Sequence, residues 1–165
     1  MVIGILSDNH GRMRPIEQAL SVFAAWNVKA ILHCGDLGGL ETVERLAGAA
    51  ERFFFVWGNT DEPQSAWAET VERLGLRWPN GPLLVELDGR RIVLAHGHEW
   101  QLAAMRQDPS LDYIFYGHTH SRSDQRNGRT RYINPGALYR TVVPTVATLD
   151  LATDALAFHE LPRRN

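Results

Sequence analysis

Short apolar runs alternate with amphipathic segments over the first half of the chain. Short apolar runs bounded by polar turns are typical of buried strands, whereas apolar positions spaced three and four apart indicate helices. We therefore expect strands at 2–7, 29–36 and 52–59, and helices at 14–26, 40–50 and 63–75. Such alternation is typical of parallel strands joined by helices.

The pattern changes in the second half, where alternating apolar and polar runs come in pairs. An Asp-Gly or Asn-Gly pair between two such runs is a strong signal for a β-hairpin. Three hairpins are expected, at 83–97, 123–134 and 145–161, and the first two turn at Asp88-Gly89 and Asn127-Gly128. Parallel units followed by hairpins predict a mixed sheet, or two packed sheets, with helices on the outside.

Length and composition limit the class of protein. The 165 residues contain no repeat, low-complexity segment or linker, so we expect one domain over 1–165. The net charge is −2 and the arginines are scattered along the sequence, which indicates no basic face for long nucleic acid. No apolar run has the length of a signal peptide or a membrane span. The lone cysteine, Cys34, excludes an internal disulfide and makes the cytoplasm the expected compartment.

Side chains that can bind metal follow four of these expected strands and a further strand that is expected to end near Tyr116. A glycine introduces or follows each cluster, at points where the backbone turns sharply or approaches something closely. Residues just beyond the carboxyl ends of strands in an open α/β sheet converge on one crevice, so we expect the clusters at one edge. They are Asp8 and His10, Asp36, Asn59 and Asp61, His96 and His98, and His118 and His120.

Carboxylate, carboxamide and imidazole groups without thiolate suit manganese, iron, nickel, cobalt or zinc. A two-metal site, with ions ~3.5–4 Å apart, needs roughly this number of groups and a carboxylate able to bridge. A single Asp-x-His or His-x-His would be weak evidence, because a strand-end histidine is more often a hydrogen-bonded polar residue than a ligand. Together, on consecutive strand ends, the clusters favour a dinuclear centre.

The polar clusters, taken in their order along the chain, resemble the motifs of the calcineurin-like metallophosphoesterases. The short length and the Asn-Pro-Gly at 134–136 resemble, more closely, the small YfcE-type phosphodiesterases of bacteria and archaea. The resemblance implies a four-layer αββα sandwich with two mixed sheets and two metal ions at the sheet edge. The motifs are DNH at 8–10, GD at 35–36, GN at 58–59, HGH at 96–98 and GHTH at 117–120.

The resemblance also implies an assignment of ligands, in which Asp36 bridges two divalent ions. Manganese is the first expectation, with nickel, iron, cobalt and zinc as alternatives. Water held between two cations loses its proton near neutral pH, and the hydroxide attacks phosphorus while the metals neutralise the phosphoryl oxygens. We therefore expect hydrolysis of a small phosphodiester without a protein nucleophile, and Cys34 as a packing residue. One ion would take Asp8, His10, Asp36 and His120, and the other Asp36, Asn59, His96 and His118.

One position departs from the wider superfamily. Many of its phosphomonoesterases and nucleases carry a histidine directly after the asparagine of GN, where it protonates the leaving group, but this chain has Thr60. Threonine cannot act as a general acid at neutral pH. The YfcE-type branch commonly lacks this histidine too. His98 is the nearest substitute and our candidate catalytic residue, with the orientation of a metal ligand as its alternative role.

Two other functions stay open. One is a non-catalytic protein-binding scaffold of the same fold, as in the retromer subunit of this superfamily, and the other is a phosphomonoesterase or nuclease. A scaffold can lose ligands freely, whereas all seven ligand positions here carry competent side chains, which favours an enzyme. A nuclease for long DNA or RNA would need a basic channel or an aromatic platform, which the sequence does not indicate. A homo-oligomer stays open, and we expect no membrane partner.

Several polar residues have simpler interpretations. Asp61 could hydrogen-bond to the ligands as a supporting carboxylate or cap the helix at 63–75, and we expect the cap. Arg140 could fork onto a phosphate, but a lone loop arginine is more often solvated. His33 and His159 are interpreted as ordinary strand residues.

Overall fold

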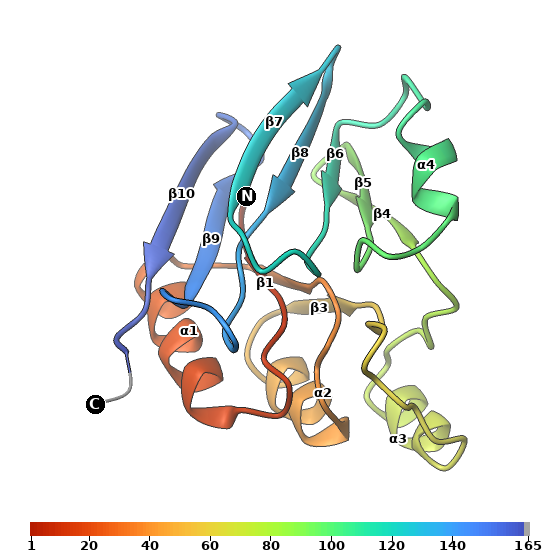
Figure 1. The fold of residues 1–165 in the computed structure, drawn as a ribbon, viewed down its shortest axis with the longest axis vertical. Helices are drawn as coiled ribbons and strands as arrows, with labels where there is room; N and C mark the ends of the chain where they lie inside the picture. The colour runs from red at the N-terminus through yellow and green to blue at the C-terminus, as the bar shows by residue number, and fades with distance from the viewer. Residues whose placement is uncertain (164–165) are drawn as a thin grey trace.

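The computed structural model describes residues 1–163 and contains two sheets with helices on their outer sides (Figure 1). Residues 164 and 165 of the expected domain lie outside the described part. The elements in chain order are β1 (Val2–Leu6), α1 (Met13–Ala25), β2 (Ala30–His33), α2 (Leu40–Ala47), β3 (Arg52–Phe55), α3 (Trp67–Arg73), β4 (Leu83–Leu87), β5 (Arg90–Leu94), α4 (Gln101–Met105), β6 (Tyr113–Phe115), β7 (Ser123–Asn127), β8 (Thr130–Asn134), β9 (Thr145–Asp150) and β10 (Ala155–Glu160).

Both sheets are mixed and have five strands each. The first has the order β10-β9-β1-β2-β3, in which β1, β2 and β3 are parallel and β9 and β10 are antiparallel additions. The second has the order β4-β5-β6-β8-β7, in which β5, β6 and β8 are parallel and the edge strands are antiparallel. The three expected hairpins are present, and the prediction of two packed mixed sheets is confirmed.

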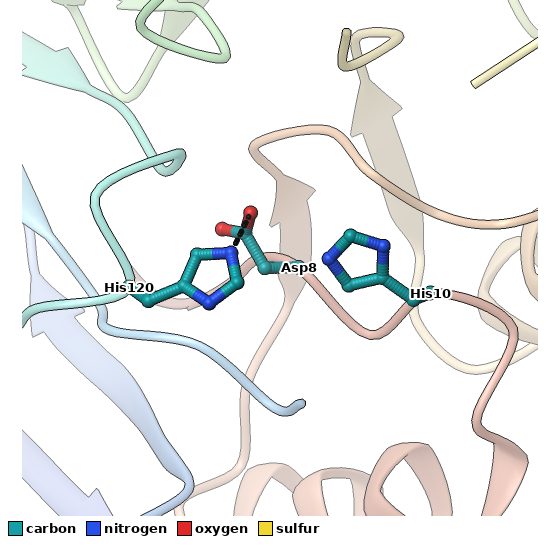
Figure 2. A group of neighbouring side chains, drawn as sticks. All are labelled: Asp8, His10 and His120. Atoms are coloured by element: carbon teal, nitrogen blue, oxygen red, sulfur yellow. Dashed lines mark ion pairs between the residues drawn. The ribbon is translucent and has the colours of Figure 1, made fainter. Parts of the chain in front are cut away.

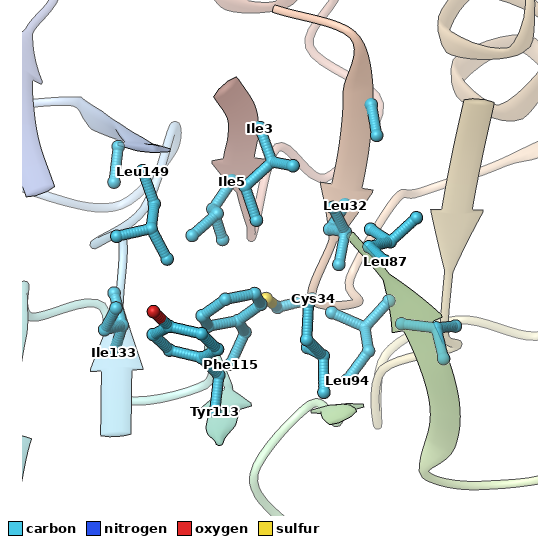
Figure 3. Close-up of a cluster of buried hydrophobic side chains, with 14 of the residues drawn as sticks. Ile3, Ile5, Leu32, Cys34, Leu87, Leu94, Tyr113, Phe115, Ile133 and Leu149 are labelled. Atoms are coloured by element: carbon cyan, nitrogen blue, oxygen red, sulfur yellow. The ribbon is translucent and has the colours of Figure 1, made fainter. Parts of the chain in front are cut away.

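The largest core lies between the two sheets. Figure 3 shows Ile3 and Ile5 of β1 on one side of this core and Tyr113 and Phe115 of β6 on the other. Cys34 is fully buried in the same cluster, as expected, and burial raises the pKa of its thiol well above the ordinary value. A thiol in this state packs like a small apolar group and is a poor nucleophile.

The outer face of each sheet is covered by helices, which completes four layers. Apolar residues of α1, α2 and α3, among them Phe23, Leu46 and Val71, pack against the first sheet. On the second sheet, Leu102 of α4 packs with Val93, Ile114 and Tyr132. The αββα sandwich implied by the resemblance is therefore confirmed, although its fourth layer contains only one short helix.

Two helical segments differ from the sequence expectation. The third helix begins at Trp67 rather than near 63, because the preceding residues form a turn in which the N–H of Trp67 donates to the carbonyl of Gln64. Helix α4 was not predicted, since five residues are too few to display a helical period. Within residues 1–163, no helix is both long enough and apolar enough to cross a bilayer.

Candidate metal centre

The loops that follow β1, β2 and β6 contain residues with left-handed backbone. Nine non-glycine residues within 1–163 have positive φ, and five of them belong to the expected ligand set. This conformation is uncommon for residues other than glycine, and sparsely populated backbone costs about 1–3 kcal/mol at each position. Strain of this kind clusters at functional sites, and here it turns the side chains toward one edge. The five are Asp8 (56°), His10 (47°), Asp36 (55°), His118 (66°) and His120 (56°).

Two glycines of the motifs allow the loops to approach these side chains. A Cβ atom at Gly58 would lie 2.0 Å from Oδ1 of Asp36, and one at Gly117 would lie 1.9 Å from Oγ of Ser7 and 2.6 Å from Oδ2 of Asp8. These distances are far below van der Waals contact. Glycine at both positions is therefore required for close approach, since any side chain would displace a carboxylate of the site.

The first group of candidate ligands consists of Asp8, His10 and His120. Figure 2 shows the two imidazoles on either side of the Asp8 carboxylate. Nε2 of His120 lies 3.1 Å from Oδ1 of Asp8, and one ligand atom from each residue fits within 4.8 Å of the others. Oδ1 of Asp8 and Nε2 of His10 are buried and have no hydrogen-bond partner in the described part of the chain.

The second group consists of Asn59, His96 and His118. Oδ1 of Asn59 lies 2.9 Å from Nε2 of His96 and 2.9 Å from Nδ1 of His118. Asp36 lies between the groups, with Oδ2 at 3.5 Å from Nε2 of His10 and Oδ1 at 3.6 Å from Nε2 of His96. All seven residues expected as ligands are thus brought together, and ligand atoms of Asp8, Asp36 and His96 also lie within 4.8 Å of one another.

Hydrogen bonds to backbone carbonyls determine which ring nitrogen of His96 and of His120 faces the ligand groups. Nδ1–H of His96 donates to the carbonyl of Cys34 at 2.8 Å, and Nδ1–H of His120 donates to the carbonyl of Arg140 at 3.3 Å. The Nε2 atoms of these two rings therefore face oxygen atoms of Asn59 and Asp8, at 2.9 and 3.1 Å. Imidazole nitrogen and carboxylate or carboxamide oxygen gathered in this way are donor atoms that divalent cations take in proteins. This donor set therefore fits divalent metal ions.

The protonation states also suit metal binding. Burial alone would raise the pKa of Asp36, but the N–H of Thr60 and the nearby imidazoles outweigh it and hold the pKa below its usual value. Burial lowers the pKa of His10, so its ring is neutral near pH 7. The site therefore offers an ionised carboxylate and a free imidazole lone pair.

His98 lies beside the second group and faces solvent. Its ring centroid is 5.4 Å from that of His96 and 6.1 Å from that of His118, and its side chain is 38% exposed. Thr60 has another role, because its N–H donates to Oδ1 of Asp36 at 3.0 Å and its hydroxyl lies 3.3 Å from Nδ1 of His10. His98 therefore borders the second group without being part of it.

Asp61 does not cap the third helix, so that expectation is wrong. Its Oδ2 accepts the N–H groups of Leu37 and Gly58, at 3.1 and 2.8 Å, and its Oδ1 accepts the N–H of Gly38 at 2.8 Å. The helix begins six residues later, at Trp67. Asp61 therefore joins the loops that carry Asp36 and Asn59.

His33 and Glu99 also support the centre, which the sequence did not indicate. The N–H of Gly35 donates to Nδ1 of His33 at 3.1 Å, so Nε2–H donates to Oδ1 of Asn9 at 2.9 Å. Burial lowers the pKa of His33 to about 3, so the ring stays neutral. His33 is a strand residue, as expected, but it is the last residue of β2 rather than an interior one. The Glu99 carboxylate accepts the N–H groups of His96 and Gly97, both at 2.6 Å. The only sequence signal was a polar residue at the end of an apolar strand.

Comparison with known proteins agrees with this geometry. Residues 1–154 match the family described as the calcineurin-like phosphoesterase superfamily domain. The chain belongs to this superfamily. Among curated calcineurin-like relatives, phosphodiesterase MJ0936 of Methanocaldococcus jannaschii is 30% identical over 91% of this chain and 93% of its own length. Phosphodiesterase YfcE of Escherichia coli strain K12 is 28% identical over 84% of this chain and 79% of its own length.

Solved structures of calcineurin-like proteins resemble the fold. An archaeal phosphodiesterase superposes with a TM-score of 0.86 at 28% identity, covering 98% of this chain and 100% of that one. Vps29 of Entamoeba histolytica, solved in complex with zinc, superposes with a TM-score of 0.69 at 22% identity, covering 97% of this chain and 91% of that one. At that identity, the second likeness concerns the fold alone.

Substitution of Gly58 by alanine tests the close approach to Asp36. We expect Gly58→Ala to lower the free energy of unfolding by about 1–3 kcal/mol and to weaken Mn²⁺ binding about 10–100-fold, because the added methyl group displaces the carboxylate. Denaturant unfolding and titration calorimetry measure the two effects. Gly48→Ala is the matched control, since Gly48 has a φ of −85° and open space at its Cβ position. Wild-type Mn²⁺ affinity in Gly58→Ala would contradict the steric role.

Proposed function

We propose that the protein is a phosphodiesterase that hydrolyses a small phosphodiester with the help of two divalent metal ions. The observation that carries the proposal is the convergence of carboxylate, carboxamide and imidazole donor atoms at one edge of the sheets, with the buried Oδ1 of Asp8 and Nε2 of His10 lacking a hydrogen-bond partner within residues 1–163. Membership of the calcineurin-like superfamily and the phosphodiesterase relatives support the same activity.

Each group would hold one ion, and Asp36 would be shared between them. The first ion would take Asp8, His10, Asp36 and His120, and the second Asp36, Asn59, His96 and His118. Ions at such a site supply Lewis-acid charge, which neutralises phosphoryl oxygens and lowers the pKa of water. We propose manganese first, because the site has no thiolate, and nickel, iron, cobalt or zinc also suit this donor set.

The protein's own residues would orient ligands and move one proton. The carbonyls of Cys34 and Arg140 keep the lone pairs of His96 and His120 directed into the site. His98 would donate a proton to the leaving-group oxygen through Nε2, because its Nδ1 faces Glu99, at 3.9 Å from Oε2. Its exposed ring can reach a bound substrate.

Further parts of the proposal concern domain and compartment. We propose that the chain acts as one domain in the cytoplasm, on a small-molecule diester. No feature within residues 1–163 favours the protein-binding alternative over hydrolysis.

Metal removal tests the proposed activity. Chelator-treated protein should lose hydrolysis of a simple aryl phosphodiester and regain it with Mn²⁺, and Asp36→Asn should lower kcat/KM about a thousandfold or more, because it removes the shared anionic ligand. Asp88→Asn is the control, since Asp88 lies in the exposed β4–β5 turn. Full activity of stripped protein without added metal would overturn the proposal.

A leaving-group comparison tests the role of His98. We expect His98→Ala to slow an alkyl diester, which has a poor leaving group, about 10²–10³-fold and a p-nitrophenyl diester much less. His98→Gln should behave like the alanine variant, because an amide cannot serve as the acid. Steady-state kinetics on both substrates measures the difference. Equal slowing of the two substrates would remove His98 from the acid role and favour ligand orientation.

A further inference from the structure

A cleft of about 780 Å³ lies beside the first ligand group and has four arginines in its lining. One wall is the first turn of α1 with the residues before it, and the other is the segment around Tyr139. The volume is typical of sites for small molecules rather than single ions. The four arginines are Arg12, Arg14, Arg140 and Arg163.

The cleft is positively charged, although the whole chain has a net charge of −2. No aspartate or glutamate of residues 1–163 lines it, and in that part of the chain none of the four arginines has a carboxylate within 4.0 Å. The four arginines are scattered along the sequence, and the fold gathers them at one place. Unpaired guanidinium groups at one place favour an anionic ligand.

Tyr139 orders two of these arginines. The Cζ atom of Arg12 lies 4.7 Å from the ring centroid and that of Arg140 lies 5.7 Å from it. The Tyr139 hydroxyl also accepts a hydrogen bond from Nη2 of Arg12 at 3.3 Å. Contacts of this kind hold the guanidinium groups in position to bind an anion. Because the two arginines cover the Tyr139 ring, little of its face is left for a flat apolar ligand to stack on.

The start of helix α1 adds to the positive charge. Positive residues are unfavourable near the N-terminus of a helix, where the backbone dipole is itself positive. Nevertheless α1 has Arg14 in its first turn, no acidic residue there, and no side-chain cap from Arg12. The local sequence thus conflicts with helix stability, and an anion in the cleft would relieve the conflict.

The cleft shares residues with the metal centre. Arg140 has a φ of 52°, and in this conformation its carbonyl accepts the hydrogen bond from His120 while its side chain lines the cleft. The Tyr139 ring centroid is 5.7 Å from that of His10. A ligand that occupies the cleft would therefore lie directly beside a phosphodiester at the ligand groups.

We propose that the cleft binds a second phosphate group of the substrate, so that the preferred substrates are phosphodiesters with a further phosphate. This inference rests on the proposed phosphodiesterase function. A long nucleic acid is less favoured, because arginines elsewhere, such as Arg45, Arg122 and Arg131, pair with carboxylates and form no continuous track.

Two matched substrates test the proposal. Thymidine 5′-(p-nitrophenyl phosphate) and its 3′-phosphorylated form differ by one phosphate and release the same product. We expect the 3′-phosphorylated substrate to have a KM at least about tenfold lower, because it gains charge-assisted hydrogen bonds. Arg12→Gln and Arg14→Gln should remove most of this advantage without changing hydrolysis of the unphosphorylated ester. Arg52→Gln is the control and should leave the advantage intact, because Arg52 begins β3 and does not line the cleft.

Binding to chelator-treated protein gives an answer independent of activity. Thymidine 3′-phosphate should bind measurably in titration calorimetry, thymidine should not, and Arg12→Gln should weaken binding about tenfold. If the protein hydrolyses neither ester, the phosphodiesterase proposal fails, while this titration still tests the cleft.

Three results would overturn the proposal. The first is no binding of thymidine 3′-phosphate. The second is inorganic phosphate that binds as tightly as thymidine 3′-phosphate while the two esters have equal KM values, which would indicate a site for free phosphate. The third is affinity for oligothymidylates that rises steadily with their length, which would indicate a nucleic-acid surface.

Discussion

The close packing of nitrogen and oxygen donor atoms from separate loops is the physical constraint on which this site depends. Oδ1 of Asp8 and Nε2 of His120 lie 3.1 Å apart, and Oδ1 of Asn59 lies 2.9 Å from Nε2 of His96. Oδ1 of Asp8 and Nε2 of His10 are buried without a hydrogen-bond partner within residues 1–163, and such atoms cost stability. Divalent cations at this place would partner them and would supply the charge that the proposed hydrolysis of a phosphodiester needs.

The surrounding structure holds these atoms in place. Left-handed backbone turns the ligands inward, and glycines at 58 and 117 give the carboxylates the space they occupy. Asp61 and Glu99 accept backbone N–H groups from the loops that carry the ligands, and thereby hold these loops in position. The two sheets contribute a rigid base, because their parallel strands end at the same edge of one shared core.

The sequence identified much of this site because ligands at strand ends have a local signature. Each cluster follows an apolar run and contains glycine, so the strand and the chemistry can be recognised together. Asp61, Glu99 and His33 were misjudged or missed, because their roles depend on contacts between loops rather than on neighbours in the chain. The arginine cleft was missed for the same reason, since Arg12 and Arg140 meet only across Tyr139 in the folded protein.

The central claim is that the two groups of candidate ligands hold a pair of ions, one in each group, with Asp36 shared between them. Electron paramagnetic resonance of chelator-treated protein titrated with Mn²⁺ tests this most directly, because ions that share a carboxylate at ~3.5–4 Å are magnetically coupled. We predict a coupled spectrum that saturates at about two ions per chain and is lost in Asp36→Asn. A spectrum of isolated Mn²⁺ ions at every ratio would contradict the claim.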